Sequence, residues 1–240
     1  MKRQSKKRSN WVLFISCGLF VSWLMRRNWP RKGVFPHLQT VKKGLADKYG
    51  EVEAAFFVGK LQQRYEVLYS ERPRFGDRKL QTHVDALIIP VLALYQGLIE
   101  KTGDPERSLV EVHDLMTRVV IGKSQVIVPS LRYFSDPFSM MRRAVRFVNK
   151  ATFPASGWDI EYIQDDAKAI AFNIHNCLFL NILTAYGVPE LTKVFCQFDD
   201  DVAELFPPQI LWQRESTLAR GAELCDFRYM RAYDEKQEQE

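Results

Sequence analysis

The sequence predicts an α+β protein in which a helical region precedes a four-stranded antiparallel sheet with helices on one face. Charged and apolar residues alternate at helical spacing through residues 34–150, whereas short segments with a period of two appear only after Trp158. The chain of 240 residues is 46% hydrophobic and 26% charged without a low-complexity tract, which is typical of a packed globular domain. We therefore expect one domain at residues 34–240, divided into a helical part (34–150), a sheet-containing part (151–231) and a charged tail (232–240), behind a separate segment at residues 1–33.

The formal net charge of +5 comes from the N-terminal segment. Nine of the 34 basic residues precede position 34, which leaves 25 basic against 29 acidic residues in the rest of the chain. A basic cluster beside an apolar segment is typical of contact with anionic lipid head groups. We expect membrane lipid as a partner of the N-terminus and no nucleic acid.

The segment Trp11–Met25 (WVLFISCGLFVSWLM) has no charged residue and is bracketed by Lys and Arg on both sides. As a helix it would be about 22 Å long, short of the roughly 30 Å hydrocarbon core of a bilayer. A single transmembrane anchor, a signal peptide, and an interfacial or buried helix are the three alternatives. No small-x-small cleavage site follows Met25, which favours an uncleaved single-pass anchor. The odd number of cysteines in the domain fits a reducing compartment, so we expect the domain in the cytoplasm.

Helical spacing after a linker rich in proline and glycine predicts helices at His37–Tyr49 and Val52–Ser70, followed by a break and a third helical stretch at Leu80–Lys101. That stretch contains the apolar run Ala86–Leu98, interrupted by Pro90. Because proline lacks an N–H and crowds the preceding turn, we expect a kink or a helix start there. The run favours a buried core helix over a second membrane span.

Two further helices are predicted, the first of them from its opening residues. Asp104, Pro105 and Glu106 provide an N-cap, a proline at the first helical position and an acid in the first turn, which predicts a helix as far as Val120. The segment Pro137–Lys150 has the pattern of a basic amphipathic helix. Its cationic face is either solvated or docked on a membrane surface.

Beyond Trp158 the pattern predicts the order β-β-α-α-β-β. Two strands, Ile160–Gln164 and Lys168–His175, are joined by a tight turn at Asp165 and Asp166. Two helices and two more strands are expected at Leu178–Gly187, from Pro189 through Cys196, and at Ile210–Ser216 and Leu224–Arg231. In the second strand small residues lead to two polar ones along one face, which predicts open space over that face; these residues are Ala169, Ala171, Asn173 and His175.

The sequence contains no P-loop, dinucleotide fingerprint, nucleophile elbow, CxxC or HExxH motif, which argues against the commonest nucleotide, redox and zinc-protease functions. Residues able to carry chemistry gather instead in the last third of the chain. They are Asn173, His175, Cys177, Cys196, Asp199–Asp201, Arg214, Glu215, Cys225 and Asp226.

The segments CLFLNILTAYGVPELTKVFCQFDDDVAELF and QRESTLARGAELCDFRY resemble the L-2-amino-thiazoline-4-carboxylic acid hydrolase family. The matching positions are Cys177, Gly187, Pro189, Glu190, Leu191, Phe195, Cys196, Asp199, Arg214, Thr217, Ala219, Gly221, Cys225, Asp226, Phe227 and Arg228. A weaker resemblance extends back to about Leu80. The resemblance implies a hydrolase that acts on a carbon–nitrogen bond other than a peptide bond, in a small cyclic amidine-like substrate. Together with the N-terminal segment, this predicts a membrane-anchored hydrolase.

The resemblance also implies roles for several of the matching residues. Water or a thiolate would attack the ring carbon between sulfur and nitrogen while an acid protonates the ring nitrogen. Cys196 would be the nucleophile or its support, and Asp199 the general acid/base. Arg214 would bind the substrate carboxylate through a bidentate contact, with Thr217 as a further substrate contact.

Strand geometry adds two candidates that are not part of the family pattern. His175 follows Asn173 on the same face of a predicted strand, so both could reach a substrate above the sheet. We expect His175 to transfer protons and Asn173 to bind substrate.

Each candidate also has a structural interpretation. The cysteines are candidates for small buried hydrophobic residues, and Asp199–Asp201 for caps of a helix at Val202–Phe206. Asp226 and Arg228 could form an exposed cross-strand pair with Glu215 and Arg214, and His175 could be a satisfied histidine at a strand end.

Two alternatives concern cofactor and function class. Thiolate and imidazole ligands suit zinc, so Cys177, Cys196 and Cys225 with His175 or Asp199 are candidate ligands for a divalent metal, although their spacing matches no known structural zinc motif. No other cofactor is indicated. The chain could instead be a ligand-binding module or a membrane-associated assembly protein that keeps the fold without the activity; an enzyme requires Cys196, Asp199 and Arg214 to converge at one water-accessible place.

Overall fold

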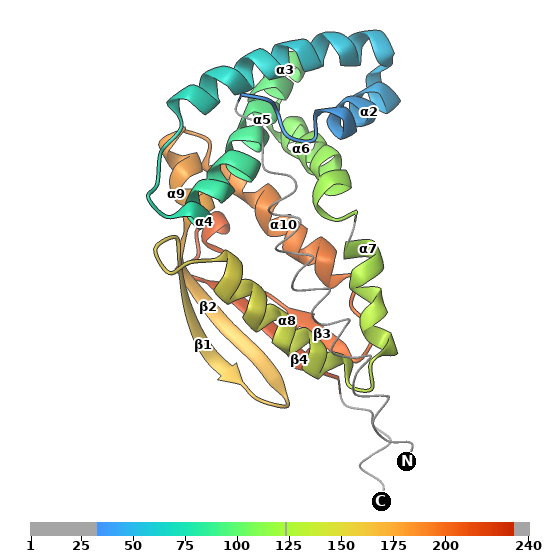
Figure 1. Cartoon of the computed structure of the whole chain (residues 1–240), viewed down its shortest axis with the longest axis vertical. Helices are drawn as coiled ribbons and strands as arrows, with labels where there is room; N and C mark the ends of the chain where they lie inside the picture. The colour runs from blue at the N-terminus through green and yellow to red at the C-terminus, as the bar shows by residue number, and fades with distance from the viewer. Residues whose placement is uncertain (1–32, 123, 233–240) are drawn as a thin grey trace, which may run out of the picture.

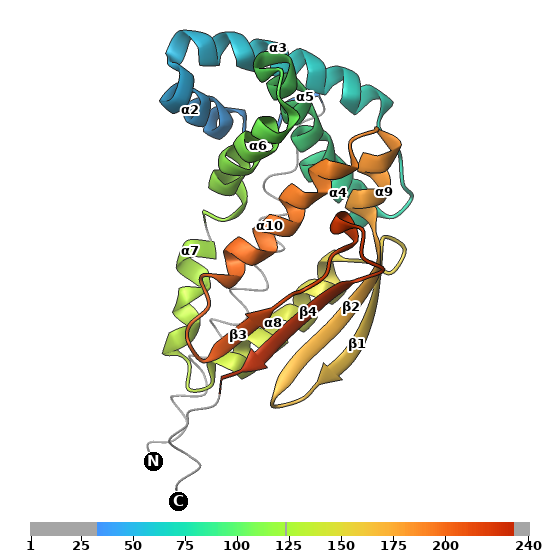
Figure 2. The same cartoon turned by 180° about the vertical axis from the view of Figure 1, so that it is seen from behind.

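The computed structural model describes residues 33–122 and 124–232. A group of helices forms one end of the molecule and a sheet the other, with helix α10 (Thr192–Ala203) running between them (Figures 1 and 2). The predicted membrane anchor at residues 1–33 and most of the charged tail lie outside the described residues.

The first two predicted helices are confirmed as α2 (Leu38–Tyr49) and α3 (Glu51–Glu71). They are separated only by Gly50, whose φ of 83° is a conformation that residues with a Cβ rarely adopt. The Gly50 N–H bonds the carbonyl of Ala46 at 2.9 Å and so closes the end of α2. The chain therefore reverses into α3 within one residue.

The apolar stretch is a buried core helix, as predicted. It consists of α4 (Arg78–His83), a π-helical turn (Val84–Ile88) and α5 (Ile89–Thr102), with Pro90 in the first turn of α5. The wide turn directly precedes the proline, and bonding such as that of the Ile89 N–H to the Val84 carbonyl shifts the helical hydrogen-bond pattern where Pro90 provides no N–H. Among the described residues it is the one helical stretch long and apolar enough to span a membrane, but 67% of its most apolar window is buried in the protein.

These two further helices are also confirmed, and each begins at a capping aspartate. In α6 (Pro105–Val120), the Asp104 carboxylate accepts a bond from the Arg107 N–H at 3.1 Å. In α8 (Pro137–Thr152), Asp136 does the same for the Ser139 N–H at 3.0 Å. Between them lie a short helix α7 (Ser124–Ile127) and a 3₁₀ turn at Pro129–Tyr133.

The four predicted strands form one antiparallel sheet in the order β1-β2-β4-β3. The strands are β1 (Trp158–Asp165), β2 (Ala169–Cys177), β3 (Ile210–Gln213) and β4 (Cys225–Arg231). Helix α9 (Leu178–Ala185), a 3₁₀ turn (Pro189–Leu191) and α10 connect β2 to β3, and a 3₁₀ turn (Leu218–Arg220) precedes β4. The predicted order β-β-α-α-β-β is therefore correct.

One face of the sheet carries aromatic side chains and is covered by α8 (Figure 1). Phe172 of β2 pairs with Phe227 of β4 and the rings stack at 5.0 Å, while Trp212 of β3 pairs with Tyr229 at 4.7 Å. Phe138 of α8 packs on this surface with no exposed area. We call this the inner face; Figure 2 shows the opposite, outer face, over which no described helix lies.

The prediction of open space above one face of β2 is wrong at its two alanines. Ala169 and Ala171 are 8% and 5% exposed. Arg228, the cross-strand partner of Ala171, is extended along β2 and donates to the Phe172 carbonyl at 2.9 Å and to Asn173 Oδ1 at 2.7 Å. This arginine covers the small side chains of the outer face.

The interpretation of Asp199–Asp201 as caps of a helix at Val202–Phe206 is also wrong. Helix α10 continues without interruption to Ala203, so the three carboxylates lie in its last turns. The reason is that the buried stripe formed by Val194, Phe195 and Phe198 keeps the helical period through this region. The acidic residues therefore lie after the buried residues of α10 in the same helix and do not begin a new one.

Candidate active site

Arg214 joins the end of β3 to the last turns of α10. Its side chain is 3% exposed. Nη1 donates to Asp199 Oδ2 at 2.9 Å, and Nη2 donates both to Asp200 Oδ2 at 2.7 Å and to the Cys196 carbonyl at 2.8 Å. The guanidinium also lies 5.2 Å from the ring of Phe227, which places it on the inner face. One side chain thus brings the predicted Cys196, Asp199 and Arg214 together.

The position of the three aspartates explains why they need this arginine. Carbonyl groups at a helix C-terminus create a negative potential, which disfavours carboxylates there. Arg214 compensates for Asp199 and Asp200, while Asp201 points to another helix and lies 2.8 Å from Nε2 of His113 on α6. Asp199 and Asp200 therefore share Arg214, and Asp201 is separate from the arginine cluster.

Asp199 has the properties of an acid–base group. Its side chain is 46% exposed, yet the surrounding protein removes enough hydration to raise the pKa of its carboxyl to about 6, against the lowering effect of Arg214. Arg214 binds Oδ2, and no described residue donates a hydrogen bond to Oδ1. Asp199 therefore combines solvent access, a free oxygen and a pKa close to neutrality.

The three cysteines lie near this carboxylate as protonated thiols. Burial and the negative charge of Asp199 raise the pKa of Cys196 to about 12. Burial raises the pKa of Cys225 to about 11, and its sulfur accepts the Leu218 N–H at 3.2 Å. Burial also raises the pKa of Cys177. None of the three has the depressed pKa of a reactive thiolate.

The proposed metal ligands do not form a coordination sphere. Within residues 33–122 and 124–232, no group of three histidine, cysteine, aspartate or glutamate side chains has a geometry that could hold a metal ion. Cys225 uses its sulfur in a backbone hydrogen bond, and Asp199 is held by Arg214. The residues thus fit an acid–base site better than a metal centre.

His175 and Asn173 are not part of the cluster. Their side chains alternate with the inner-face residues of β2 and so lie on the outer face. His175 Nε2 is 2.9 Å from Glu161 Oε2, and Asn173 accepts its bond from Arg228. Their predicted roles would require a substrate on the side of the sheet away from Arg214.

One other interpretation is settled by hydrogen bonds. The expected cross-strand ion pair of Asp226 and Arg228 with Glu215 and Arg214 is wrong, because Asp226 accepts backbone N–H groups of Glu215 at 3.1 Å and Ser216 at 2.6 Å. This contact fixes the loop that follows Arg214. Thr217, in the same loop, is 2% exposed, and its hydroxyl has no described hydrogen-bond partner.

Three residues of the cluster were given no role in the site from the sequence. Asp200 is bound by Arg214 and also accepts Nε1 of Trp212 at 3.3 Å. Tyr229 lies opposite Trp212, and burial together with Asp199 raises its pKa. The spacing of two between Trp212 and Arg214 could have placed Trp212 on the same face, but Tyr229 follows only from the strand register.

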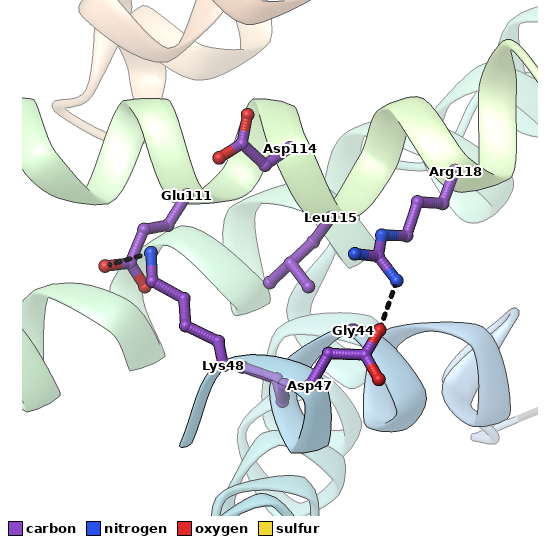
Figure 3. A pocket seen from close by; sticks show the side chains of 8 residues that line it. Gly44, Asp47, Lys48, Glu111, Asp114, Leu115 and Arg118 are labelled. Carbon is purple, nitrogen blue, oxygen red and sulfur yellow. Dashed lines mark hydrogen bonds and ion pairs between the residues drawn. The ribbon is translucent and has the colours of Figure 1, made fainter. Parts of the chain in front are cut away.

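A separate cavity of about 250 Å³ lies between α2 and α6 (Figure 3). Its charged groups are largely matched, since Lys48 lies 2.9 Å from Glu111 and Arg118 lies 2.7 Å from Asp47. None of the residues predicted to act in the site lines it; its lining consists of Gly44, Leu45, Asp47, Lys48, Glu111, Asp114, Leu115 and Arg118.

Comparisons with known structures and curated sequences add little. The Fe(II) unliganded H-NOX protein from K. algicida superposes with a TM-score of 0.35 at 12% identity, covering 85% of this chain and 98% of that one. A point mutant of the same protein gives a TM-score of 0.34 at 11% identity, covering 86% and 100%. No curated protein sequence matches.

The comparison with protein families is informative. The sequence model for L-2-amino-thiazoline-4-carboxylic acid hydrolase matches residues 81–229, more than half of the chain. This range contains most of the apolar core helix, the sheet as far as Tyr229 of β4, and every member of the arginine cluster. The chain therefore belongs to the L-2-amino-thiazoline-4-carboxylic acid hydrolase family.

Proposed function

We propose that this protein is a hydrolase that opens a carbon–nitrogen bond in a small cyclic amidine-like substrate, with Asp199 as its general acid/base. Family membership supports the reaction class. The observation that carries the proposal is the Asp199–Arg214 contact at 2.9 Å, in which a half-exposed carboxyl group has a pKa of about 6. A catalytic group of this kind is populated in both protonation states near neutral pH and can accept and return a proton.

The reaction needs two protons to pass from water to the ring nitrogen. Ionised Asp199 takes the first proton from water while the water oxygen bonds to the ring carbon between sulfur and nitrogen, the π electrons of the C=N bond move to the nitrogen, and Asp199 then gives its proton to that nitrogen. The new hydroxyl group next gives its proton to Asp199 as the carbonyl forms and the remaining carbon–nitrogen single bond breaks, and Asp199 passes this second proton to the nitrogen, which leaves with the bonding pair. The net change is the addition of one water, and the carboxylate is restored.

Cys196 supports this site as a neutral thiol. Direct attack by sulfur would require the thiolate, but its pKa of about 12 keeps the thiol protonated near neutral pH. The backbone carbonyl of Cys196 binds Arg214 and helps to hold the arginine behind Asp199. Water is therefore the nucleophile in the proposed mechanism.

Residues 1–33 are proposed as a single-pass membrane anchor that keeps the domain on the cytoplasmic side. Support comes from the uncharged segment Trp11–Met25 and the basic residues on both of its sides. The full chain expressed in cells should remain in the membrane pellet after carbonate extraction. Release into the supernatant would contradict an integral anchor.

The activity is tested by incubating the purified full chain with L-2-amino-thiazoline-4-carboxylate and following ring opening by chromatography. Ring opening above the uncatalysed rate is expected. If substrate is unchanged after prolonged incubation with a folded sample, the hydrolase assignment fails for this compound and a ligand-binding role becomes the better account.

A further inference from the structure

The internal hydrogen bonds of Arg214 leave it without a free edge for a carboxylate. Both N–H groups of Nη2 are engaged, by the Cys196 carbonyl at 2.8 Å and by Asp200 at 2.7 Å. A guanidinium binds a carboxylate bidentately through Nη2 together with either Nε or Nη1. A substrate carboxylate could therefore form a bidentate contact only by breaking one of these internal bonds.

The part of the cluster that faces solvent is anionic. The Asp199 side chain is 46% exposed and that of Asp200 is 31% exposed, whereas Arg214 behind them is 3% exposed. With both carboxyl groups ionised, the three residues have a net charge of −1. The C-terminal end of α10 adds negative potential at the same place.

One oxygen in this anionic surface is free to accept a bond. Asp200 uses Oδ2 for Arg214 and Oδ1 for Trp212, but Asp199 uses only Oδ2 within the described residues. Asp199 Oδ1 is thus an acceptor for an N–H donor from a ligand. Arg214 fixes both carboxylates in position, so this acceptor is preorganised.

We infer that the site recognises the cationic nitrogen end of a small ring, through Asp199 with Asp200 beside it, and does not recognise a ligand carboxylate through Arg214. This inference rests on the proposed function and adds the substrate class. Rings with an exposed, protonated amidine-like N–C–N group are the expected ligands. A carboxylate on the ring is tolerated at best.

Two compounds distinguish recognition of the cationic ring nitrogens by Asp199 from recognition of a ligand carboxylate by Arg214. L-2-amino-thiazoline-4-carboxylate carries both groups, and 2-amino-2-thiazoline has the same ring without the carboxylate. At pH 7.5 Asp199 is ionised, so the extra negative charge of the first compound is repelled by the site. The carboxylate-free ring should bind roughly 3- to 10-fold more tightly, the range expected for one additional like charge several ångströms away in a partly hydrated site.

The experiment is calorimetric titration of the full chain with each compound, beside an assay of ring opening. The substitution Asp200→Asn removes one negative charge and should abolish the preference for the carboxylate-free ring. Asp201→Asn is the matched control, because it removes the same charge from the same helix end but faces His113. The wild-type comparison of the two compounds does not depend on either variant folding.

The outcomes distinguish the inference from the function. Tighter binding of 2-amino-2-thiazoline that is lost in Asp200→Asn and kept in Asp201→Asn supports the inference. Binding of the carboxylated compound at least as tight as that of the carboxylate-free ring, with ring opening observed, overturns the inference and leaves the hydrolase intact. Absence of both binding and ring opening overturns both.

Discussion

The guanidinium of Arg214 and the carboxylate of Asp199 meet between the sheet and α10, with 2.9 Å between Nη1 and Oδ2. Burial raises the pKa of the carboxyl and the positive charge lowers it, and the result is a value of about 6. Helix α10 positions the Asp199 carboxyl group, and Arg214 lowers its pKa. This relationship has consequences for the pH dependence of activity.

Activity should fall below pH 6. The proposed base must be ionised to take a proton from water, so kcat/KM should decline about tenfold per pH unit on the acid side of the inflection and level off above it. Measurement of kcat/KM between pH 4.5 and 8.5 tests this. An inflection near pH 4, the ordinary range of an aspartate, would contradict the raised pKa of Asp199.

Replacing Arg214 should move this inflection upward. Arg214→Gln removes the charge that lowers the pKa of Asp199 while the carboxyl stays in place, so ionisation requires higher pH. The same pH profile on this variant is the readout, with near-UV circular dichroism as the check of folding. A loss of activity without a shift of the inflection would assign Arg214 a purely structural role.

Removal of the Cys196 thiol should have a small effect. Because the thiol is protonated and water is the proposed nucleophile, Cys196→Ala should keep kcat within about tenfold of wild type. An effect of this size is typical of the loss of a residue beside the catalytic group, whereas loss of the nucleophile itself lowers kcat far more. The wild-type thiol should also react slowly with iodoacetamide at pH 7.5. A loss of three or more orders of magnitude would indicate covalent catalysis by Cys196.

The core helix should dominate stability. Leu92 in α5 has no exposed surface, and Leu92→Ala should lower the free energy of unfolding by about 2–5 kcal/mol. Leu211, 49% exposed on the outer face, is the control, and its alanine variant should change stability by less than about 1 kcal/mol. Urea denaturation followed by circular dichroism compares them; equal losses would contradict the assignment of the core.

Local signals predicted most of the fold. Asp104 before Pro105 specifies a helix start through a short-range cap, which was visible in the sequence, whereas α8 was predicted from its amphipathic pattern. The continuation of α10 through Asp199–Asp201 was not predicted from the sequence, because aspartates usually mark the start of a helix. Their place near a helix end depends on Arg214, whose contact with them exists only in the folded chain.

The candidate site was predictable in part. The family pattern supplied Cys196, Asp199 and Arg214. In the structure Cys196 and Asp199 are three residues apart on one helix, which places them on adjacent turns. His175 was chosen from alternation along β2, but alternation alone does not say which face meets α10. Tyr229 depends on the pairing of β4 with β3, which the local pattern does not specify.

The most direct test of the account is the rate of ring opening of L-2-amino-thiazoline-4-carboxylate by the full chain, wild type beside Asp199→Asn and Asp201→Asn. Asparagine can still accept the bond from Arg214 but cannot transfer a proton. The account predicts a loss of about 10²- to 10⁴-fold for Asp199→Asn, the usual contribution of a general acid/base, and a near wild-type rate for Asp201→Asn. Equal rates in wild type and Asp199→Asn would contradict it.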